Sequence, residues 1–362
     1  MRKVIIIGCG IVGATIAYEL SQVPNLKITV LDKQAPAKAA TGAALGVLMG
    51  VISQKVKGRN WQLRESSIKR YETLIPELEG IIGRRIPVNK DGILLLCLEG
   101  EDLSNWEKLV ATRKSQGWQL EIWDVEKVRD RSPQLKLDNI IAAIYSPQDR
   151  QVDPTVLTLA LVEAAKQNGV NFQFDTNVLD IRISPTASCQ IQTTAESLEC
   201  DWLVIAAGLG STAVTASLKQ PIDIRPVLGQ ALHLRLENTL SHPHFQPVVT
   251  CDDVHIVPLG NGEYWVGATV EFPVGEGEIV ADGGKLDEVL EKAIAFCPAL
   301  AEANIIKKWS GLRPRPEGQP APIIGKLPGY DRVIIASGHY RNGVLLAPAT
   351  AQAIREFIAF SS

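Results

Sequence analysis

The chain has 362 residues, enough for two domains or for one large α/β domain with an insertion. Its 37 Lys and Arg nearly balance 40 Asp and Glu, for a net charge of −3, which argues against a protein that binds nucleic acid through clustered positive charge. Hydrophobic residues make up 46% of the chain and charged residues 21%, which excludes an intrinsically disordered protein.

The six cysteines are scattered along the chain and form no C-x-x-C pair. We interpret them as free core thiols of a protein in a reducing compartment, rather than as disulfides or a zinc site. Residues 4–7 are too short an apolar run for a signal peptide, and residues 342–354 are too few to span a bilayer. We therefore expect a cytoplasmic protein with no metal site and no membrane contact. The cysteines are Cys9, Cys97, Cys189, Cys200, Cys251 and Cys297.

A complete βαβ unit is predicted at the start of the chain. Residues 4–7 are a β-branched run, typical of a strand buried on both faces. Residues 14–21 have the apolar spacing of a helix, and residues 27–31 predict a second strand.

The turn between the first strand and the helix has the sequence Gly8-x-Gly10-x-x-Gly13. Glycines at these positions permit a tight turn and the close approach of a pyrophosphate, and the helix N-terminus offers unpaired N–H groups to that anion. Asp32 ends the second strand 19 residues after Gly13, where a carboxylate accepts hydrogen bonds from a ribose. We predict a dinucleotide site; a glycine-rich turn without a ligand is the alternative.

The segment at residues 39–46 is rich in Ala and Gly and poor in charge. Small side chains let a backbone come close to a ligand. Together with the late return of the chain to its first domain, the segment favours FAD over NAD, because the larger ligand needs contacts from several distant segments. A tightly packed helix start is the alternative explanation.

The remaining elements alternate between helical and strand-like patterns. Asp153 and Pro154 predict the N-cap and the first residue of a helix that stops at Gly169. Alternating patterns between residues 221 and 307 predict an antiparallel sheet. We further predict helices at residues 60–79, 102–116 and 343–360, and strands at residues 93–98, 170–174, 178–183, 202–207 and 333–336.

The fold class that follows is α/β, with a Rossmann-like FAD-binding domain around a parallel sheet and a substrate domain around a mixed, largely antiparallel sheet. The chain leaves the first domain and returns to it twice. We predict the FAD-binding domain at residues 1–85, 147–220 and 308–362, and the substrate-binding domain at residues 86–146 and 221–307.

Two later segments carry candidate substrate groups. Arg313 precedes Pro314, and its planar fork is well suited to a carboxylate; it is either an anchor held rigidly in a cleft or a solvated arginine in a Pro-rich loop. Residues 339–343 follow the last strand and open the last helix, where backbone amides stabilise negative charge on a flavin ring and Arg341 adds to them or to the substrate carboxylate. An ordinary polar loop is the alternative. The sequence has no catalytic triad, P-loop or zinc-protease motif, which is compatible with a flavoenzyme.

With these motifs assembled, the sequence resembles the D-amino-acid oxidase family of flavoproteins, and most closely its glycine oxidase branch, over essentially its whole length. The motifs that carry the resemblance are GCGIVGATIAYEL at 8–20, AATGAALGVL at 39–48, PVLGQ at 226–230, VGATVE at 266–271, GLRP at 311–314 and ASGHYRNGVLLAPATAQ at 336–352.

The resemblance implies that FAD is bound without a covalent link. No histidine precedes His233 and no cysteine lies at residues 311–325, so neither covalent link found in relatives is expected. It also implies that Arg313 binds the substrate carboxylate, with Arg341 beside it and His255 in the same pocket, and that no residue acts as a catalytic acid or base. The implied cofactor-binding residues are Gly8, Gly10, Ile11, Val12, Gly13, Asp32, Lys33, Ala40, Thr41, Leu45, Gly46, Val47, Val178, Ala207, Gly208, His339, Tyr340, Arg341, Asn342, Gly343, Val344 and Leu345.

The activity that the resemblance implies is oxidative deamination of glycine, and of sarcosine or small D-amino acids, to an imine or glyoxylate, with dioxygen reduced to hydrogen peroxide. The implied partners are thiazole synthase of thiamine biosynthesis and further copies of the chain in a tetramer. His255, Val270 and Arg315 depart from the family pattern, which leaves substrate preference open. A D-amino-acid dehydrogenase that uses a quinone, and a flavin-binding protein without turnover, are the alternatives.

Overall fold

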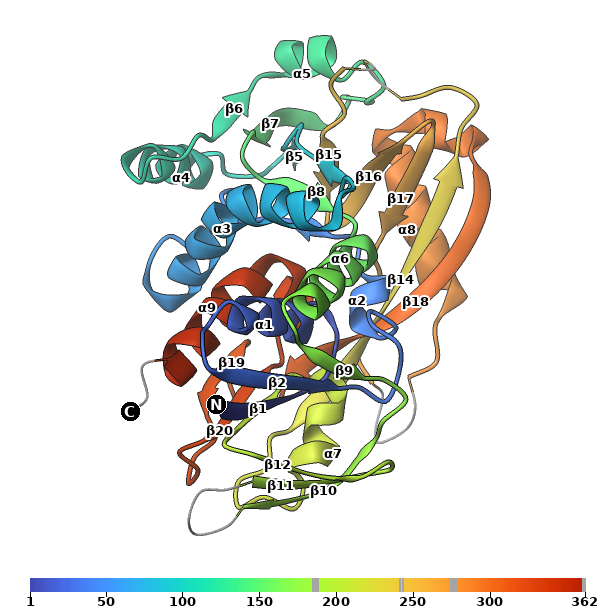
Figure 1. Cartoon of the computed structure of the whole chain (residues 1–362). Helices are drawn as coiled ribbons and strands as arrows, with labels where there is room; N and C mark the ends of the chain where they lie inside the picture. The colour runs from blue at the N-terminus through green and yellow to red at the C-terminus, as the bar shows by residue number, and fades with distance from the viewer. Residues whose placement is uncertain (184–188, 241, 243, 274–278, 360–362) are drawn as a thin grey trace.

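The computed structural model describes residues 1–183, 189–240, 242, 244–273 and 279–359. Four sheets and a set of helices make up this part of the chain (Figure 1). Its α-helices are α1 (Ile11–Ser21), α2 (Ala40–Ala43), α3 (Gly58–Ile82), α4 (Ser104–Ser115), α5 (Val125–Arg131), α6 (Pro154–Gln167), α7 (Ser211–Thr215), α8 (Gly283–Phe296) and α9 (Gly343–Ala359), and its short 3-10 helices are η1 (Gly208–Gly210), η2 (Pro298–Glu302) and η3 (Tyr340–Asn342).

A six-stranded sheet contains both strands of the predicted βαβ unit. Its strands, in spatial order, are β19 (Ile323–Lys326), β20 (Val333–Ser337), β13 (Trp202–Ile205), β1 (Arg2–Ile7), β2 (Leu26–Leu31) and β9 (Asn171–Gln173). All neighbouring pairs are parallel except β19 with β20. The predicted parallel sheet is therefore confirmed.

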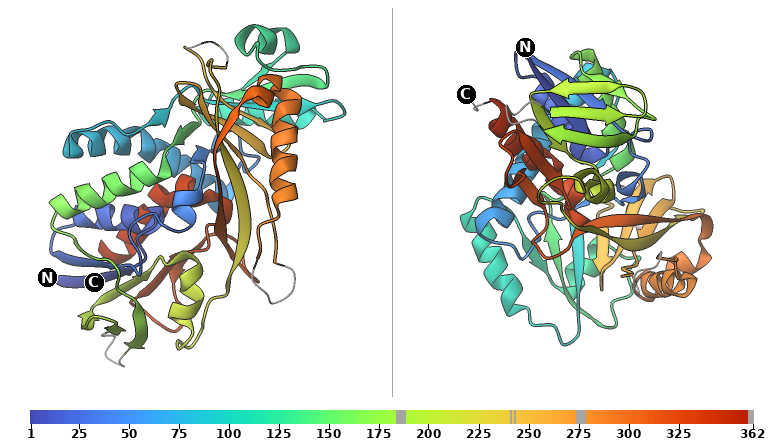
Figure 2. Two further views of the ribbon diagram at one scale, coloured as in Figure 1. Left: turned by 90° about the vertical axis from the view of Figure 1, so that its right-hand side faces the viewer. Right: turned by 90° about the horizontal axis from the view of Figure 1, so that it is seen from below.

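Both faces of this sheet are covered, because alternate residues of β1 enter different cores. Val4 and Ile6 pack among residues of α1, α3, α6 and α9, whereas Ile5 and Ile7 pack toward a three-stranded sheet. That second sheet is formed by β10 (Val178–Ile183), β11 (Cys189–Thr193) and β12 (Ser197–Cys200). Figures 1 and 2 show the helices on one side of β1 and β2 and the small sheet on the other. The continuous apolar run at residues 4–7 is explained by this double burial.

An eight-stranded sheet forms the other large layer, and the long curved strands at its edge stand out in Figure 2. Its strands, in spatial order, are β18 (Asn304–Pro316), β14 (Ile224–Arg235), β17 (Glu263–Gly267), β16 (Val254–Gly260), β15 (Val248–Cys251), β5 (Ile93–Leu98), β7 (Ile140–Ser146) and β6 (Glu121–Trp123). Only β15 and β5 pair in parallel among these neighbours, so the predicted, largely antiparallel sheet is confirmed.

A small three-stranded sheet is formed by β3 (Val47–Leu48), β8 (Arg150–Val152) and β4 (Val88–Asn89). Its strands occur where the chain passes from one large sheet to the other. The predicted domain boundary between residues 307 and 308 falls inside β18, which pairs with β14 along its whole length. The domain limits themselves stay a prediction.

The helix signals hold where they were local. Asp153 caps α6, because its carboxylate accepts hydrogen bonds from the N–H groups of Thr155 and Val156 at 2.9 Å. Gly169 follows the helix with a φ of +88°, which suits glycine. The helix predicted at 60–79 is α3, which is longer at both ends. It begins at Gly58 and continues to Ile82, where Gly83 ends it in the left-handed conformation. Phe360, the last residue of the predicted C-terminal helix, lies outside the described residues.

All six cysteines are buried and free of disulfides. Within the described ranges, no helix is both long and apolar enough to cross a membrane. The same part of the chain holds no group of three or more His, Cys, Asp or Glu side chains arranged for a metal ion.

Candidate active site

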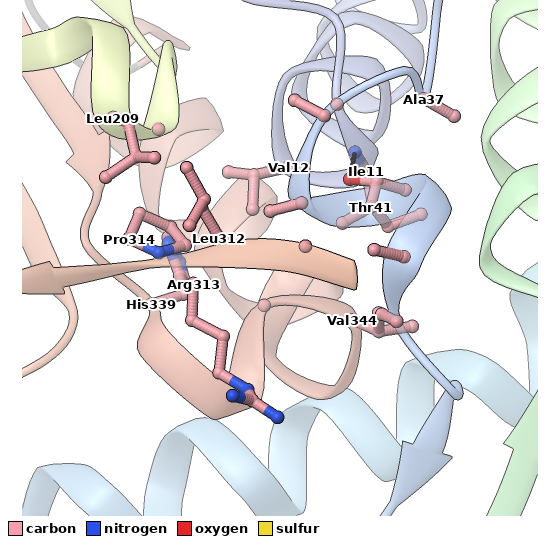
Figure 3. A pocket seen from close by; sticks show the side chains of 18 of the residues that line it. Ile11, Val12, Ala37, Thr41, Leu209, Leu312, Arg313, Pro314, His339 and Val344 are labelled. Atoms are coloured by element: carbon pink, nitrogen blue, oxygen red, sulfur yellow. Dashed lines mark hydrogen bonds between the residues drawn. The ribbon is translucent and has the colours of Figure 1, made fainter. Parts of the chain in front are cut away.

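A cavity of about 580 Å³ lies between the two large sheets. Its walls come from the turn after β1, the segment after β2 that contains α2, the end of β13, strands β14 and β18, and the turn that opens α9. Figure 3 shows Ile11 and Thr41 close together in one part of the cavity, with Arg313 extending away from its strand in another. The cavity therefore has two ends with different chemistry.

The glycine-rich turn packs too tightly for any side chain at its first and third glycines. Gly8 has a φ of +105°, and a Cβ there would lie 2.5 Å from the carbonyl oxygen of Ala206. A Cβ on Gly13 would lie 1.9 Å from the carbonyl oxygen of Gly8. The turn is thus a cradle made of backbone atoms, and a side chain at either position would clash with them.

The N-terminus of α1 opens into this cradle. The helix begins at Ile11, and its N-cap Gly10 provides no side-chain acceptor. The Ile11 N–H donates to Thr41 Oγ1 at 3.0 Å, which ties α2 to the start of α1. The amide of Val12, in the first turn, has no acceptor within the helix and lies beside the cavity. The Val12 amide and the dipole of α1 therefore form a site for an anion such as a diphosphate.

Asp32 is held beside the same turn. Its Oδ2 accepts the Cys9 N–H at 2.6 Å, and its Oδ1 accepts the Gln34 N–H at 2.9 Å. A carboxylate oxygen can accept two hydrogen bonds, so each oxygen of Asp32 can still accept one from a ribose hydroxyl. The geometry of the strand, turn, helix and carboxylate therefore fits the nucleotide half of FAD.

The other end of the cavity carries a fixed cation. Arg313 lies in β18, not in a Pro-rich loop, and its Nη1 donates to the carbonyl oxygens of Leu228 and Thr269 at 3.0 Å each. Burial lowers the pKa of Arg313 from its usual value, and the neighbouring charge of Arg341 adds to the effect. Arginine stays protonated in proteins despite such a shift, so the wall presents a permanent positive charge.

A more exposed ion pair lies beside Arg313. Arg341 Nη1 is 3.4 Å from Asp253 Oδ1, and the Asp253 side chain is 76% exposed. The nearby His255 is half-buried, and its Nδ1 lies 2.9 Å from Thr250 Oγ1. Loss of solvent above all lowers the pKa of His255 to about 4; Asp253 opposes this shift, and the charges of Arg341 and Arg313 contribute to it. His255 is therefore neutral at neutral pH.

His339 is the second imidazole of the cavity wall, and unlike His255 it is fully buried. Its Nε2 is 2.9 Å from Thr350 Oγ1, and that hydroxyl donates to the Leu346 carbonyl at 2.8 Å. Because the hydroxyl proton is used there, His339 Nε2 must carry the hydrogen and donate it. Burial lowers the pKa of His339 to about 4, with a smaller contribution from Arg59. This ring is also neutral at neutral pH.

Most of the predicted site residues border this cavity, but four do not. Gly13 and Leu345 pack inside their helices, Val178 begins β10, and Asn342 lies near Arg64, with its Oδ1 3.5 Å from Nη2. The predicted residues that line the cavity are Gly8, Gly10, Ile11, Val12, Asp32, Lys33, Ala40, Thr41, Leu45, Gly46, Val47, Ala207, Gly208, His255, Arg313, His339, Tyr340, Arg341, Gly343 and Val344.

Several residues that line the cavity were not predicted from the sequence as site residues. Gly229 and Gln230 line the wall from β14, and they belong to the PVLGQ motif, which was a signal of family but not of role. Asp253 lines the cavity from the turn between β15 and β16, where an acidic pair usually marks only a solvated turn.

Comparison with known proteins agrees with this geometry. The model of the family described as FAD dependent oxidoreductase (DAO) matches residues 3–357. A glycine oxidase of Bacillus licheniformis is 31% identical over 366 residues, covering 99% of this chain and 94% of that protein. A bifunctional ThiO/ThiG protein of Synechocystis is 33% identical over 358 residues, covering 98% of this chain and 51% of that protein.

A solved structure supports the same relationship. The crystal structure of glycine oxidase from Geobacillus kaustophilus superposes with a TM-score of 0.88 at 26% identity, covering 100% of this chain and 96% of that one. The family match spans nearly the whole chain, and the cradle, the Asp32 carboxylate beside it and the long cavity fit its cofactor. The chain is a member of the DAO family of FAD-dependent oxidoreductases, acts on amines or amino acids, and has FAD as its cofactor.

Proposed function

We propose that the protein oxidises glycine, and other small amino acids such as sarcosine, with dioxygen as the electron acceptor. In the overall reaction, glycine, dioxygen and water give glyoxylate, ammonia and hydrogen peroxide. The observation that carries the proposal is the guanidinium of Arg313, fixed in the wall of the FAD cavity by two carbonyl oxygens. The glycine oxidases among the relatives support the choice of substrate class.

FAD is held mainly by backbone groups in this proposal. The Val12 amide and the dipole of α1 would hold its diphosphate, and Asp32 would accept a hydrogen bond from its ribose. The small residues of α2 border the middle of the cavity, and the segment from His339 to Val344 borders its far part. The chemistry that FAD supplies when bound is the acceptance of two electrons with the hydrogen of the substrate Cα, as the carbon–nitrogen bond becomes a double bond.

Arg313 positions the substrate. Both hydrogens of Nη1 are used by Leu228 and Thr269, so the edge formed by Nε and Nη2 is left to bind a carboxylate with two parallel hydrogen bonds. Neutral His255 adds no third positive charge beside Arg313 and Arg341. The amino acid is thereby oriented by its carboxylate, and orientation is the main demand of this reaction on the protein.

The decisive experiment is a substrate panel on the purified holoprotein. We expect a yellow flavin spectrum and peroxide formation in air with glycine or sarcosine, compared with D-alanine and D-proline. Turnover with an artificial quinone but without peroxide would replace the oxidase by a D-amino-acid dehydrogenase. A flavin that no amine bleaches under anaerobic conditions would instead leave a flavin-binding protein without turnover.

We also propose that the imine product is passed to thiazole synthase, as the source of part of the thiazole of thiamine. The proposal rests on the Synechocystis relative, whose name joins ThiO to ThiG in one chain. If transfer occurs, adding thiazole synthase and its other substrates should lower the yield of glyoxylate per peroxide formed. An unchanged ratio would contradict transfer while leaving the oxidase activity intact.

A further inference from the structure

Gly229 lies directly beneath the guanidinium of Arg313. In the antiparallel pair of β14 and β18, Arg313 is opposite Val227 and Gly311 is opposite Gly229. Opposed residues point to the same face of a sheet, and residues two apart share that face. The Arg313 side chain therefore leaves β18, crosses to β14 and covers Gly229.

The overlap at Gly229 is large. An ideal Cβ on Gly229 would lie 2.3 Å from both Nη1 and Nη2 of Arg313 and 2.4 Å from its Cζ. Because the three distances are nearly equal, the missing Cβ would lie over the guanidinium group and not beside a single nitrogen. Any side chain at this position must displace the cation.

The backbone of Gly229 gives no other reason for glycine. Gly8 and Gly338 have φ values of +105° and +67°, which favour glycine whatever the surroundings. Gly229 lies in the regular ladder of β14, outside the left-handed region. Alanine is therefore acceptable to the backbone here, and the three atoms nearest to its Cβ all belong to the guanidinium.

The guanidinium has no nearby alternative position that keeps its hydrogen bonds. The carbonyl of Leu228 belongs to a residue that exchanges two backbone hydrogen bonds with Glu271, both 2.9 Å long. Thr269 is fixed to Gln230 by the hydrogen bond from the Gln230 N–H to Thr269 Oγ1 at 2.9 Å. Since both acceptors of Nη1 are fixed, a guanidinium lifted from Gly229 loses them.

We propose that Gly229 is a positioning residue for substrate recognition: the missing side chain sets the location of the Arg313 guanidinium, and so how deeply the substrate carboxylate binds. This inference rests on the proposed role of Arg313 as the carboxylate anchor. It assigns to the glycine of the PVLGQ motif a role in the substrate end of the cavity, in addition to its place in the sheet.

The test uses acetate, an unreactive carboxylate, titrated into the holoprotein while the flavin absorbance is recorded. We expect Gly229→Ala to weaken acetate binding at least about tenfold and to raise the KM for glycine, since small misplacements of a binding group are costly. FAD content and Tm should stay near those of the wild type. Gly80→Ala is the matched control, because Gly80 is an exposed helical residue with no atom within 4 Å of its added Cβ.

A double-mutant cycle separates positioning from a general effect on the fold. In an Arg313→Lys background no guanidinium overlaps the added methyl group, so Gly229→Ala should then change acetate binding by less than about twofold. An effect of equal size in both backgrounds would overturn the inference. If Gly229→Ala alone does not fold, the double variant should fold and bind FAD; a double variant that also fails would show that Gly229 serves the backbone.

Acetate binding distinguishes an error in the proposed role of Arg313 from an error in the proposed role of Gly229. If Arg313→Ala binds acetate as the wild type does, the proposed role of Arg313 is wrong. If Arg313→Ala weakens acetate binding and Gly229→Ala does not, the anchor stands and the positioning role of Gly229 is wrong.

Discussion

The two ends of the cavity are built in different ways. At the proposed nucleotide end the anion site comes from the backbone of one short stretch, the turn between β1 and α1, where Gly8 and Gly13 exclude side chains, and the Asp32 carboxylate lies beside it. At the substrate end the polar groups are the side chains of Arg313, Arg341 and His255, which come from separate elements and meet only in the folded chain.

The difference predicts how each end responds to mutation. A backbone cradle fails when a side chain is added, because neither the turn nor the helix has room to move. A side-chain site fails when a group is removed, and the rest of the fold remains. An added side chain at the nucleotide end should therefore lower stability and FAD content together, and removal of the Arg313 guanidinium should lower substrate affinity alone.

The largest effect is expected for Gly13→Ala. The new Cβ would lie 1.9 Å from the Gly8 carbonyl oxygen, so the first turn of α1 must shift. We expect a loss of about 3 kcal/mol or more in the free energy of unfolding, together with loss of bound FAD. Denaturant unfolding and the flavin content of the purified protein measure both. Full FAD content and unchanged stability would show that the two ends do not differ in this way.

Arg313→Ala should spare the nucleotide end. We expect the KM for glycine to rise by about 100-fold, since removal of a buried charged partner costs several kcal/mol of binding. FAD content should remain that of the wild type, because the guanidinium lies at the far end of the cavity. Arg313→Lys, which keeps the charge without the planar fork, should give an intermediate KM. Loss of FAD in either variant would contradict the separation.

The substrate end should also make the protein sensitive to mild acid. His255 and His339 have pKa values lowered from 6.5 to about 4 in the folded state. As the pH falls, the unfolded chain therefore binds protons on these rings at a higher pH than the folded chain does. Their contribution to stability is complete above pH 6.5 and is lost as the pH falls toward 4, by about 1.4 kcal/mol per pH unit for each histidine.

Replacing one of these rings tests the prediction. In His339→Gln the side-chain amide still donates toward Thr350, and the slope of unfolding free energy against pH between 6.5 and 4 should fall by the share of one proton. His244→Gln, at an exposed histidine, is the control. An unchanged slope in His339→Gln would show that this ring does not contribute.

The smallest effect is expected for Asp253→Asn. The Arg341–Asp253 pair is long at 3.4 Å and both side chains are exposed, so solvent screens it. We expect acetate to bind up to about fivefold more tightly, because one negative charge beside the arginines is removed, and the gain should vanish at high salt. Weaker binding in Asp253→Asn would show that the carboxylate supports the substrate site directly.

The same contrast explains what the sequence could predict. The βαβ unit and its turn were predicted because strand, glycines, helix and Asp32 follow one another within one stretch, and each has a local signal. Even the N-cap of α6 was local, since Asp153 contacts amides two and three residues away.

The substrate end depended on pairing that the sequence does not encode locally. The sequence is compatible with Arg313 in a cleft or in a Pro-rich loop, because most arginines are solvated, and Pro314 and Pro316 argue against a strand interior. The structure places both prolines in β18 at the edge of the eight-stranded sheet, where a missing N–H is tolerated. The contact with Thr269 joins residues 44 positions apart, and no periodicity reports it.

Burial decides how three of the cysteines respond to an oxidant. Burial raises the pKa of Cys97 to about 12, of Cys251 to about 11 and of Cys297 to about 12. Peroxide attacks thiolates, and these groups remain protonated thiols in neutral solution. If hydrogen peroxide is the product, burial protects these three cysteines from oxidation by it. The number of free thiols should then remain unchanged after repeated turnover.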